Sequence, residues 1–193
     1  TGTFANSTAI MTCCHAGDKV LVEEEQHILL TEKFVFEKDY GRLIPVCYRL
    51  DHKHMPDPEE IDRLLSESGS KLVCLENSHN SAGGYCIDCS TLEKIRKVAD
   101  KHGAWIHMDG ARLFHAAAYL DTTASQLCQY ADSVMFCVSK GLGAPIGSLL
   151  CSTEDLCKKA RENRKLFGGV MRQAGVAAAA AMYALENNIE RLR

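Results

Sequence analysis

A lysine and an aspartate each lie at the end of a predicted strand in this sequence, and together they could carry out chemistry. Residues 132–139 lead into Lys140 and then into glycines, and residues 104–108 lead into Asp109. Such a lysine either extends its stem past the core to reach water or lies in a desolvated pocket, where the neutral, nucleophilic amine is favoured. A nucleophilic lysine can form a Schiff base with pyridoxal phosphate, and an aspartate can keep that cofactor's ring nitrogen protonated. We expect Lys140 in a desolvated pocket with Asp109 nearby.

Three further positions could complete a site of this kind. Gly2 and Thr3 precede a helix expected to begin near Asn6, and free backbone N–H groups at a helix start suit a phosphate. His27 follows the acidic run 23–25 and Gln26, and could stack on the pyridine ring. His79 could accept a proton from a substrate hydroxyl. Either histidine could equally be an ordinary turn residue.

Helix and strand patterns alternate along the chain without internal repeats. Asp57-Pro58-Glu59-Glu60 is a strong helix start, with an N-cap, a proline in the first turn and a glutamate at the third position. The expected strands are 19–22, 71–76, 104–109 and 132–139, and the expected helices are 6–15, a helix opening at 57–60, 90–103, 154–166 and 174–193. This alternation predicts an α/β fold whose mostly parallel sheet has helices on both faces.

Polar residues end three of these strands, at 76–80, 107–112 and 139–141. In parallel sheets, ligands bind beyond the carboxyl ends of the strands. We therefore expect these three segments to converge on one site.

Composition argues against several other function classes. The 193 residues carry a net charge of −3, with 22 basic and 25 acidic side chains and no dense basic block, which argues against nucleic-acid binding. No run is long and apolar enough for a membrane span. The ten cysteines lie largely in apolar runs, such as Cys74, Cys137 and Cys151, which favours reduced thiols and a cytoplasmic protein. The lone CxxC motif at 86–89 has no second pair, so no metal is expected.

Four stretches, "LENSHN", "HMDGARLF", "DSVMFCVSKGLGAPIGSLL" and "RKLFGGVMRQAG", together resemble the L-threonine aldolases, which are pyridoxal-phosphate enzymes of the beta-eliminating lyase family. The resemblance is nearly collinear over residues 1–193. It implies the large domain of the fold type I superfamily. It also implies a carbon–carbon lyase that cleaves L-threonine or L-allo-threonine to glycine and acetaldehyde.

The resemblance also assigns roles to individual residues. It implies that Lys140 forms the Schiff base, that Asp109 pairs with the ring nitrogen and that Arg112 binds the substrate carboxylate. The expected catalytic residues are Lys140, His27, His79 and Asp109, and the residues expected to hold the cofactor are Gly2, Thr3, His27, Asp109, Arg112, Lys140 and Arg172. In this assignment His27 stacks on the cofactor, His79 lies near the β-hydroxyl of the substrate, and Arg172 reaches phosphate across a subunit interface.

The resemblance implies a homodimer or homotetramer acting on a small amino-acid substrate. It also implies a longer protein, because family members have an N-terminal segment and a smaller C-terminal domain in addition to the part matched by residues 1–193. Two alternatives stay open at this point. One is another fold type I lyase or racemase acting on amino acids, and the other is a truncated, inactive scaffold.

Overall fold

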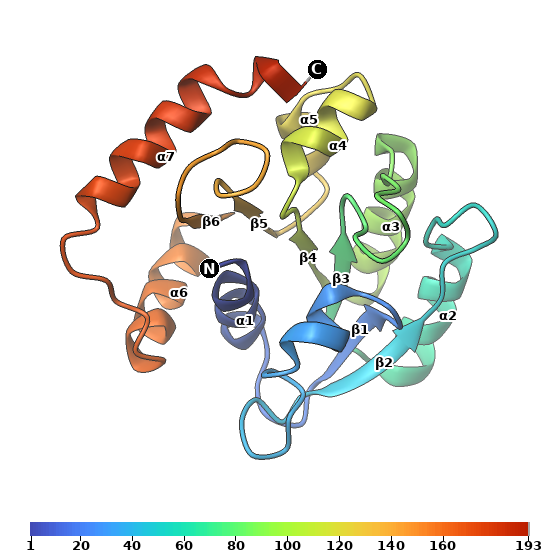
Figure 1. Cartoon of the computed structure of the whole chain (residues 1–193). Helices are drawn as coiled ribbons and strands as arrows, with labels where there is room; N and C mark the ends of the chain where they lie inside the picture. Colours follow the sequence, from blue (N-terminus) through green and yellow to red (C-terminus); the bar gives the residue numbers. More distant parts are fainter. Residues whose placement is uncertain (193) are drawn as a thin grey trace.

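The computed structural model describes residues 1–192 and contains a six-stranded sheet with helices packed on it (Figure 1). The strands are β1 (Lys19–Glu23), β2 (Ile44–Tyr48), β3 (Leu72–Glu76), β4 (Trp105–Asp109), β5 (Ser133–Cys137) and β6 (Ser148–Ser152). The α-helices are α1 (Gly2–Cys13), α2 (Pro58–Ser68), α3 (Cys89–His102), α4 (Leu113–Tyr119), α5 (Ala124–Cys128), α6 (Glu154–Leu166) and α7 (Gly175–Asn187). A π-helical turn, η1 (Ile28–Glu32), and a 3-10 turn, η2 (Glu190–Leu192), complete the elements.

The sheet has the order β2-β1-β3-β4-β5-β6 and is parallel except for the antiparallel pair of β5 and β6. Helices α2 and α3 pack together on one face, and α1 with α6 covers the other (Figure 1). Successive residues of β1 point to opposite faces of the sheet. Leu21 belongs to the hydrophobic cluster with α2 and α3, while Val20 and Val22 belong to the cluster with α1. The predicted α/β fold with helices on both faces is confirmed.

Helix starts that depend on local capping agree closely with the sequence. Asp57 is the N-cap of α2, where its carboxylate accepts the N–H of Glu59 at 2.9 Å. The range predicted for α6 is also the one observed. The start predicted for α1 is wrong, because Thr1 and not Asn6 is the N-cap, its hydroxyl accepting the N–H of Phe4. Gly2 and Thr3 are therefore the first turn of α1 and not a loop in front of it.

The sequence pattern does not predict several elements of the structure. The two edge strands β2 and β6 consist mostly of exposed and half-exposed residues, and neither was among the strands expected from the sequence. The short helices α4 and α5 were not predicted. The helix expected over 174–193 ends at Asn187, and Arg193 lies outside the described residues.

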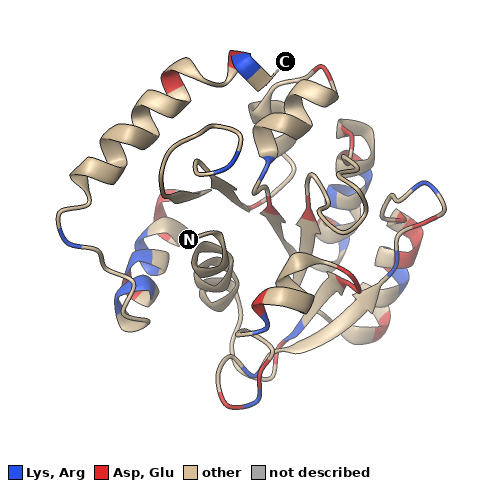
Figure 2. Ribbon diagram, in the orientation of Figure 1, with Lys and Arg blue, Asp and Glu red and all other residues tan. Residues whose placement is uncertain are grey.

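Helix α7 follows the outside of the molecule, away from the sheet (Figure 1). Figure 2 shows that α1 and α7 are almost free of charged residues, whereas α6 carries many. Burial between the sheet and α6 explains the uncharged α1, but Val176, Met182 and Tyr183 of α7 are 60–85% exposed. Within residues 1–192, no helix has the length and apolar character needed to cross a membrane.

All ten cysteines are free thiols in the described chain. Cys74 and Cys137 are buried as expected, but Cys151 is exposed because it lies on the edge strand β6. Cys86 and Cys89 of the CxxC motif donate to different carbonyl groups, those of Gly84 and Gln126.

Candidate active site

A cavity of about 390 Å³ opens at the carboxyl ends of β3, β4 and β5, where the polar strand ends were expected to meet. Figure 2 shows acidic residues at the tips of β3 and β4, and the register places Glu76 opposite Asp109. Six of the predicted site residues line this cavity, namely Gly2, Thr3, His27, Asp109, Arg112 and Lys140. The predicted convergence is thus observed for residues that lie far apart in the sequence.

The start of α1 forms one wall of the cavity. Thr1, Gly2 and Thr3 line it, so the first turn of the helix directs its unpaired N–H groups and the positive end of its dipole there. A Cβ added to Gly2 would lie 3.1 Å from the Cys137 Sγ and 3.5 Å from the Met135 Cε. Glycine at this position therefore lets the helix start lie close against β5, and the wall suits a phosphate.

Asp109 is 2% exposed at the end of β4, and both of its carboxylate oxygens accept hydrogen bonds. Oδ2 accepts the side-chain amide of Asn6 at 2.8 Å, and Oδ1 accepts the N–H of Ala111 at 3.0 Å. Burial raises the pKa of Asp109 to about 6, helped by the charges of Glu76 and Glu32 and opposed by those two hydrogen bonds. A cation or proton donor in the cavity would relieve this excess of negative charge.

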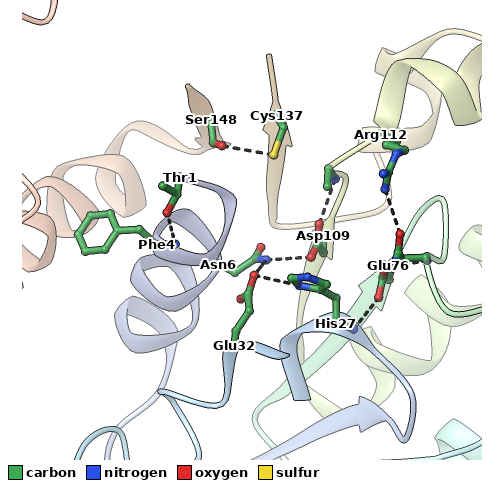
Figure 3. A network of polar contacts seen from close by, with 12 residues as sticks. Thr1, Phe4, Asn6, His27, Glu32, Glu76, Asp109, Arg112, Cys137 and Ser148 are labelled. Atoms are coloured by element: carbon green, nitrogen blue, oxygen red, sulfur yellow. Dashed lines mark hydrogen bonds and ion pairs between the residues drawn. The ribbon is translucent and has the colours of Figure 1, made fainter. Parts of the chain in front are cut away.

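Glu32 is a residue of this site that the sequence analysis missed. Its Oε1 accepts the amide of Asn6 at 3.1 Å and lies 3.3 Å from the Nδ1 of His27 (Figure 3). Burial raises the pKa of Glu32, while Asn6 and His27 oppose that shift. The sequence pattern did not indicate it, because Glu32 lies at the end of η1, a π-helical turn that no periodicity predicted.

Glu76 connects two walls of the cavity through main-chain hydrogen bonds. Its Oε2 accepts the N–H of His27 at 2.9 Å and its Oε1 accepts the N–H of Asn80 at 2.8 Å. The side chain of Asn80 in turn accepts the guanidinium of Arg112 at 3.2 Å. The arginine expected to bind a substrate carboxylate is thereby positioned beside the cavity (Figure 3).

Lys140 lines the cavity, but its side chain is exposed in this chain. The expectation of a desolvated pocket is therefore wrong for the structure described. Strand β5 ends at Cys137, and the loop that follows has both buried and exposed residues, with Pro145 and Ile146 exposed like Lys140. Lys140 thus lines the same cavity as Asp109, as predicted, but it is not buried.

His79 and Arg172 are not among the residues that line the cavity. His79 is 4% exposed, with its Nε2 2.9 Å from the Oε2 of Glu23, while its Nδ1 accepts the N–H of Ala82. Arg172 is exposed in the connection between α6 and α7. The roles assigned to these two residues stay predictions.

Comparison with known proteins identifies the family. The profile of the beta-eliminating lyases matches residues 1–193. The chain belongs to the beta-eliminating lyase family. Two curated relatives are a low-specificity L-threonine aldolase 1 of Arabidopsis thaliana, 36% identical over 200 residues, and a low specificity L-threonine aldolase of Escherichia coli O157:H7, 35% identical over 208 residues. Both alignments cover 100% of this chain, and they cover 56% and 58% of the relatives.

Solved structures show the same fold for this beta-eliminating lyase chain. A Listeria monocytogenes protein assigned as an L-allo-threonine aldolase superposes with a TM-score of 0.88 at 23% identity, covering 100% of this chain and 53% of that one. The threonine aldolase of Leishmania major has a TM-score of 0.82 at 21% identity, covering 98% and 57%. The expected fold type I architecture is confirmed, and the chain spans little more than half the length of these relatives.

The cavity of this beta-eliminating lyase fits pyridoxal phosphate, the cofactor that the family implies. The helix start suits the phosphate, and the Oε2 of Glu32 is a buried oxygen without a hydrogen-bond partner among the described residues. Ligand atoms of His27, Glu32 and Asp109 lie within 4.8 Å of one another. The carboxylates of Glu32 and Asp109 bring negative charge to this cluster, and a protonated pyridine nitrogen would supply a balancing positive charge.

Proposed function

We propose that residues 1–193 form the cofactor-binding domain of a pyridoxal-phosphate-dependent threonine aldolase. The reaction is cleavage of L-threonine or L-allo-threonine to glycine and acetaldehyde. The observation that carries the proposal is that Lys140, Asp109, Arg112 and the start of α1 line one cavity. The curated relatives named as low-specificity L-threonine aldolases support the choice of substrate.

Each wall of the cavity has one task in this proposal. The N–H groups at the start of α1 bind the phosphate, and Asp109 holds the proton on the ring nitrogen. When bound, pyridoxal phosphate supplies an aldehyde for attachment to an amine and a ring that accepts electrons from a cleaved bond. Lys140 presents its amine at the cavity wall, and His27 flanks the ring.

Arg112 selects the bond that breaks by holding the substrate carboxylate. Its guanidinium is oriented by Asn80, and a fixed carboxylate orients the remaining bonds at Cα. A base must also remove the proton of the β-hydroxyl. We assign that role to His79, acting directly or through water. In the structure its two ring nitrogens contact Glu23 and the N–H of Ala82.

A covalent labelling experiment tests the cofactor site. The chain is incubated with pyridoxal phosphate, reduced with borohydride and digested, and the modified lysine is found by mass spectrometry. We expect one adduct on Lys140, absent in Lys140→Ala and retained in Lys165→Ala, a matched change on α6 outside the cavity. An adduct on another lysine would refute the assignment, and no adduct would favour the inactive scaffold.

A product assay separates the aldolase from the other fold type I chemistries. L-allo-threonine should yield equal amounts of glycine and acetaldehyde in the full-length protein. Ammonia with a keto acid would indicate an eliminating lyase, and conversion to the D-isomer would indicate a racemase.

We further infer assembly with a second copy of the chain in the cytoplasm. The exposed apolar residues of α7, Val176, Met182 and Tyr183, support an interface between protomers. The ten free thiols are consistent with a reducing compartment. Sedimentation of the purified protein would show a dimer or tetramer, and a monomer at all concentrations would contradict the assembly.

A further inference from the structure

Asn6 is fully buried on α1, and its side-chain amide contacts two carboxylates of the site from behind. Its Nδ2 donates to the Oδ2 of Asp109 at 2.8 Å and to the Oε1 of Glu32 at 3.1 Å (Figure 3). Asn6 is not among the residues that line the cavity. It therefore reaches the cofactor site only through the two carboxylates.

The amide orientation of Asn6 follows from these contacts. Both carboxylates accept hydrogen bonds, so the NH₂ group must face them and the oxygen must face the other way. The Oδ1 of Asn6 lies 3.0 Å from the Nε2 of His107, which must therefore be the donor. The Nδ1 of His107 is then an acceptor, and it lies 2.8 Å from the hydroxyl of Ser133, which donates to it.

The result is a directed row of hydrogen bonds from Ser133 through His107 and Asn6 to Asp109. His107 and Ser133 face each other across β4 and β5, so the sheet register holds the far end of the row. Both residues are at most 1% exposed. Burial lowers the pKa of His107 to about 4 and outweighs an opposing contact with the main chain of Ser133, so the ring is neutral at pH 7 with one donor and one acceptor, as the row requires.

The row acts on a carboxylate whose surroundings oppose its charge. Asp109 is buried close to Glu32 and Glu76, and both favour its protonated form. The donated bonds from Asn6 and the N–H of Ala111 favour the ionised form. The second amide hydrogen of Asn6 holds Glu32, which in turn lies beside His27.

We propose that Asn6, His107 and Ser133 are positioning residues that hold Asp109 ionised and aimed at the ring nitrogen of the cofactor. This inference rests on the proposed function, since it assigns the row a role toward pyridoxal phosphate. A buried polar row that only stabilises the fold would not affect how the site distinguishes a ring nitrogen from a carbon. That distinction separates the two roles.

The experiment compares binding of pyridoxal phosphate with binding of its deaza analogue, in which CH replaces the ring nitrogen. Both have the same aldehyde and phosphate, so the ratio of their dissociation constants isolates the contact at the ring nitrogen. We expect the wild-type chain to prefer the nitrogen compound by about ten-fold or more, the usual effect of one hydrogen bond to a charged group. Asn6→Ala should lose most of that preference, and Ser133→Ala should lose part of it.

Asn163→Ala is the matched control, because the amide of Asn163 also bonds to α1, at Thr12 and Met11, but does not lead to Asp109. It should keep the full preference. An unchanged preference in Asn6→Ala would overturn the inference while leaving the proposed function intact. Failure of the wild-type chain to bind either compound would overturn the proposed function instead, and with it the role of the row.

A second measurement does not require cofactor or a folded Asn6 variant. Nitrogen-15 NMR of the wild-type chain reports the protonation of each ring nitrogen of His107. We expect a neutral ring with its proton on Nε2 at pH 7, and a changed Nδ1 resonance in Ser133→Ala. A charged ring, or a proton on Nδ1, would reverse the row and overturn the inference.

Discussion

The carboxylate of Glu76 accepts the main-chain N–H of His27 at 2.9 Å, and its second oxygen accepts the N–H of Asn80 at 2.8 Å. One buried side chain at the end of β3 thus joins the segment that carries the ring-flanking histidine to the segment that orients Arg112. Glu76 thus couples two walls of the site through hydrogen bonds alone, without a role in the reaction.

Replacing Glu76 should therefore loosen both walls. In Glu76→Gln one oxygen remains, and the new NH₂ group faces a main-chain donor, so we expect a loss of about 1–3 kcal/mol in the free energy of unfolding. Affinity for pyridoxal phosphate should fall as well. Urea denaturation measures the first effect. Glu93→Gln, which breaks only an exposed pair with Lys97, is the control and should cost less than about 1 kcal/mol. Equal losses in the two variants would contradict the coupling.

Asp109→Asn should change the pH dependence of stability in the cofactor-free chain. The pKa of Asp109 is raised from 3.8 to about 6, so its ionisation costs stability as pH rises through that interval and the full cost is present above about pH 6. A shift of this size corresponds to roughly 3 kcal/mol. The amide loses one hydrogen bond but avoids this cost, so the melting temperature of Asp109→Asn should improve relative to wild type between pH 4 and pH 8.

Thermal melts at several pH values measure this difference. Asp88→Asn is the control, because it keeps an N-cap oxygen for α3 outside the site. A difference in melting temperature between wild type and Asp109→Asn that stays constant with pH would show that burial does not raise the pKa of Asp109.

Gly2→Ala should weaken binding of the phosphate group. The new Cβ would lie 3.1 Å from the Cys137 Sγ, so the start of α1 must move away from β5 by a few tenths of an ångström. We expect a several-fold rise in the dissociation constant for pyridoxal phosphate, measured by absorbance titration. Gly175→Ala meets no atom within 4 Å at the start of α7 and should be neutral or stabilising by up to about 1 kcal/mol. Unchanged affinity in Gly2→Ala would place the phosphate elsewhere.

His79→Asn should reduce stability more at pH 5.5 than at pH 8. Burial lowers the pKa of His79, but its hydrogen bond to Glu23 and the charges of Glu76 and Glu23 outweigh burial, so the pKa is raised. A raised histidine pKa contributes stability that is complete below about pH 6.5 and is lost as pH rises through the folded-state value. Denaturation curves at the two pH values test this, with exposed His52→Asn as the control.

The same variant tests the proposed base. If His79 removes the β-hydroxyl proton, turnover of L-allo-threonine should fall far more than cofactor affinity. Loss of stability with unchanged turnover would limit His79 to its structural bond with Glu23.

The elements of the fold that were predictable are those specified by neighbours in the sequence. The start of α2 at Asp57 and the limits of α6 follow from capping side chains that bond within one turn. Strand β3 is a continuous apolar run that ends in Glu76, and β4 is largely apolar and ends in Asp109, so their ends could be placed as well. Edge strands β2 and β6 could not be placed, because Pro45 lies within β2 and β6 has only three apolar residues between its terminal serines.

For the site, the sequence by itself determined which groups are available, namely Lys140, Asp109, Arg112 and Gly2 near the first helix. Only the tertiary structure decided which groups meet. The order β1-β3-β4 aligns the strand ends, and η1 brings Glu32 to the amide of Asn6. It also decided that Lys140 is exposed. Capping and apolar runs act between near neighbours, whereas burial and charge coupling depend on what the completed fold packs against each side chain.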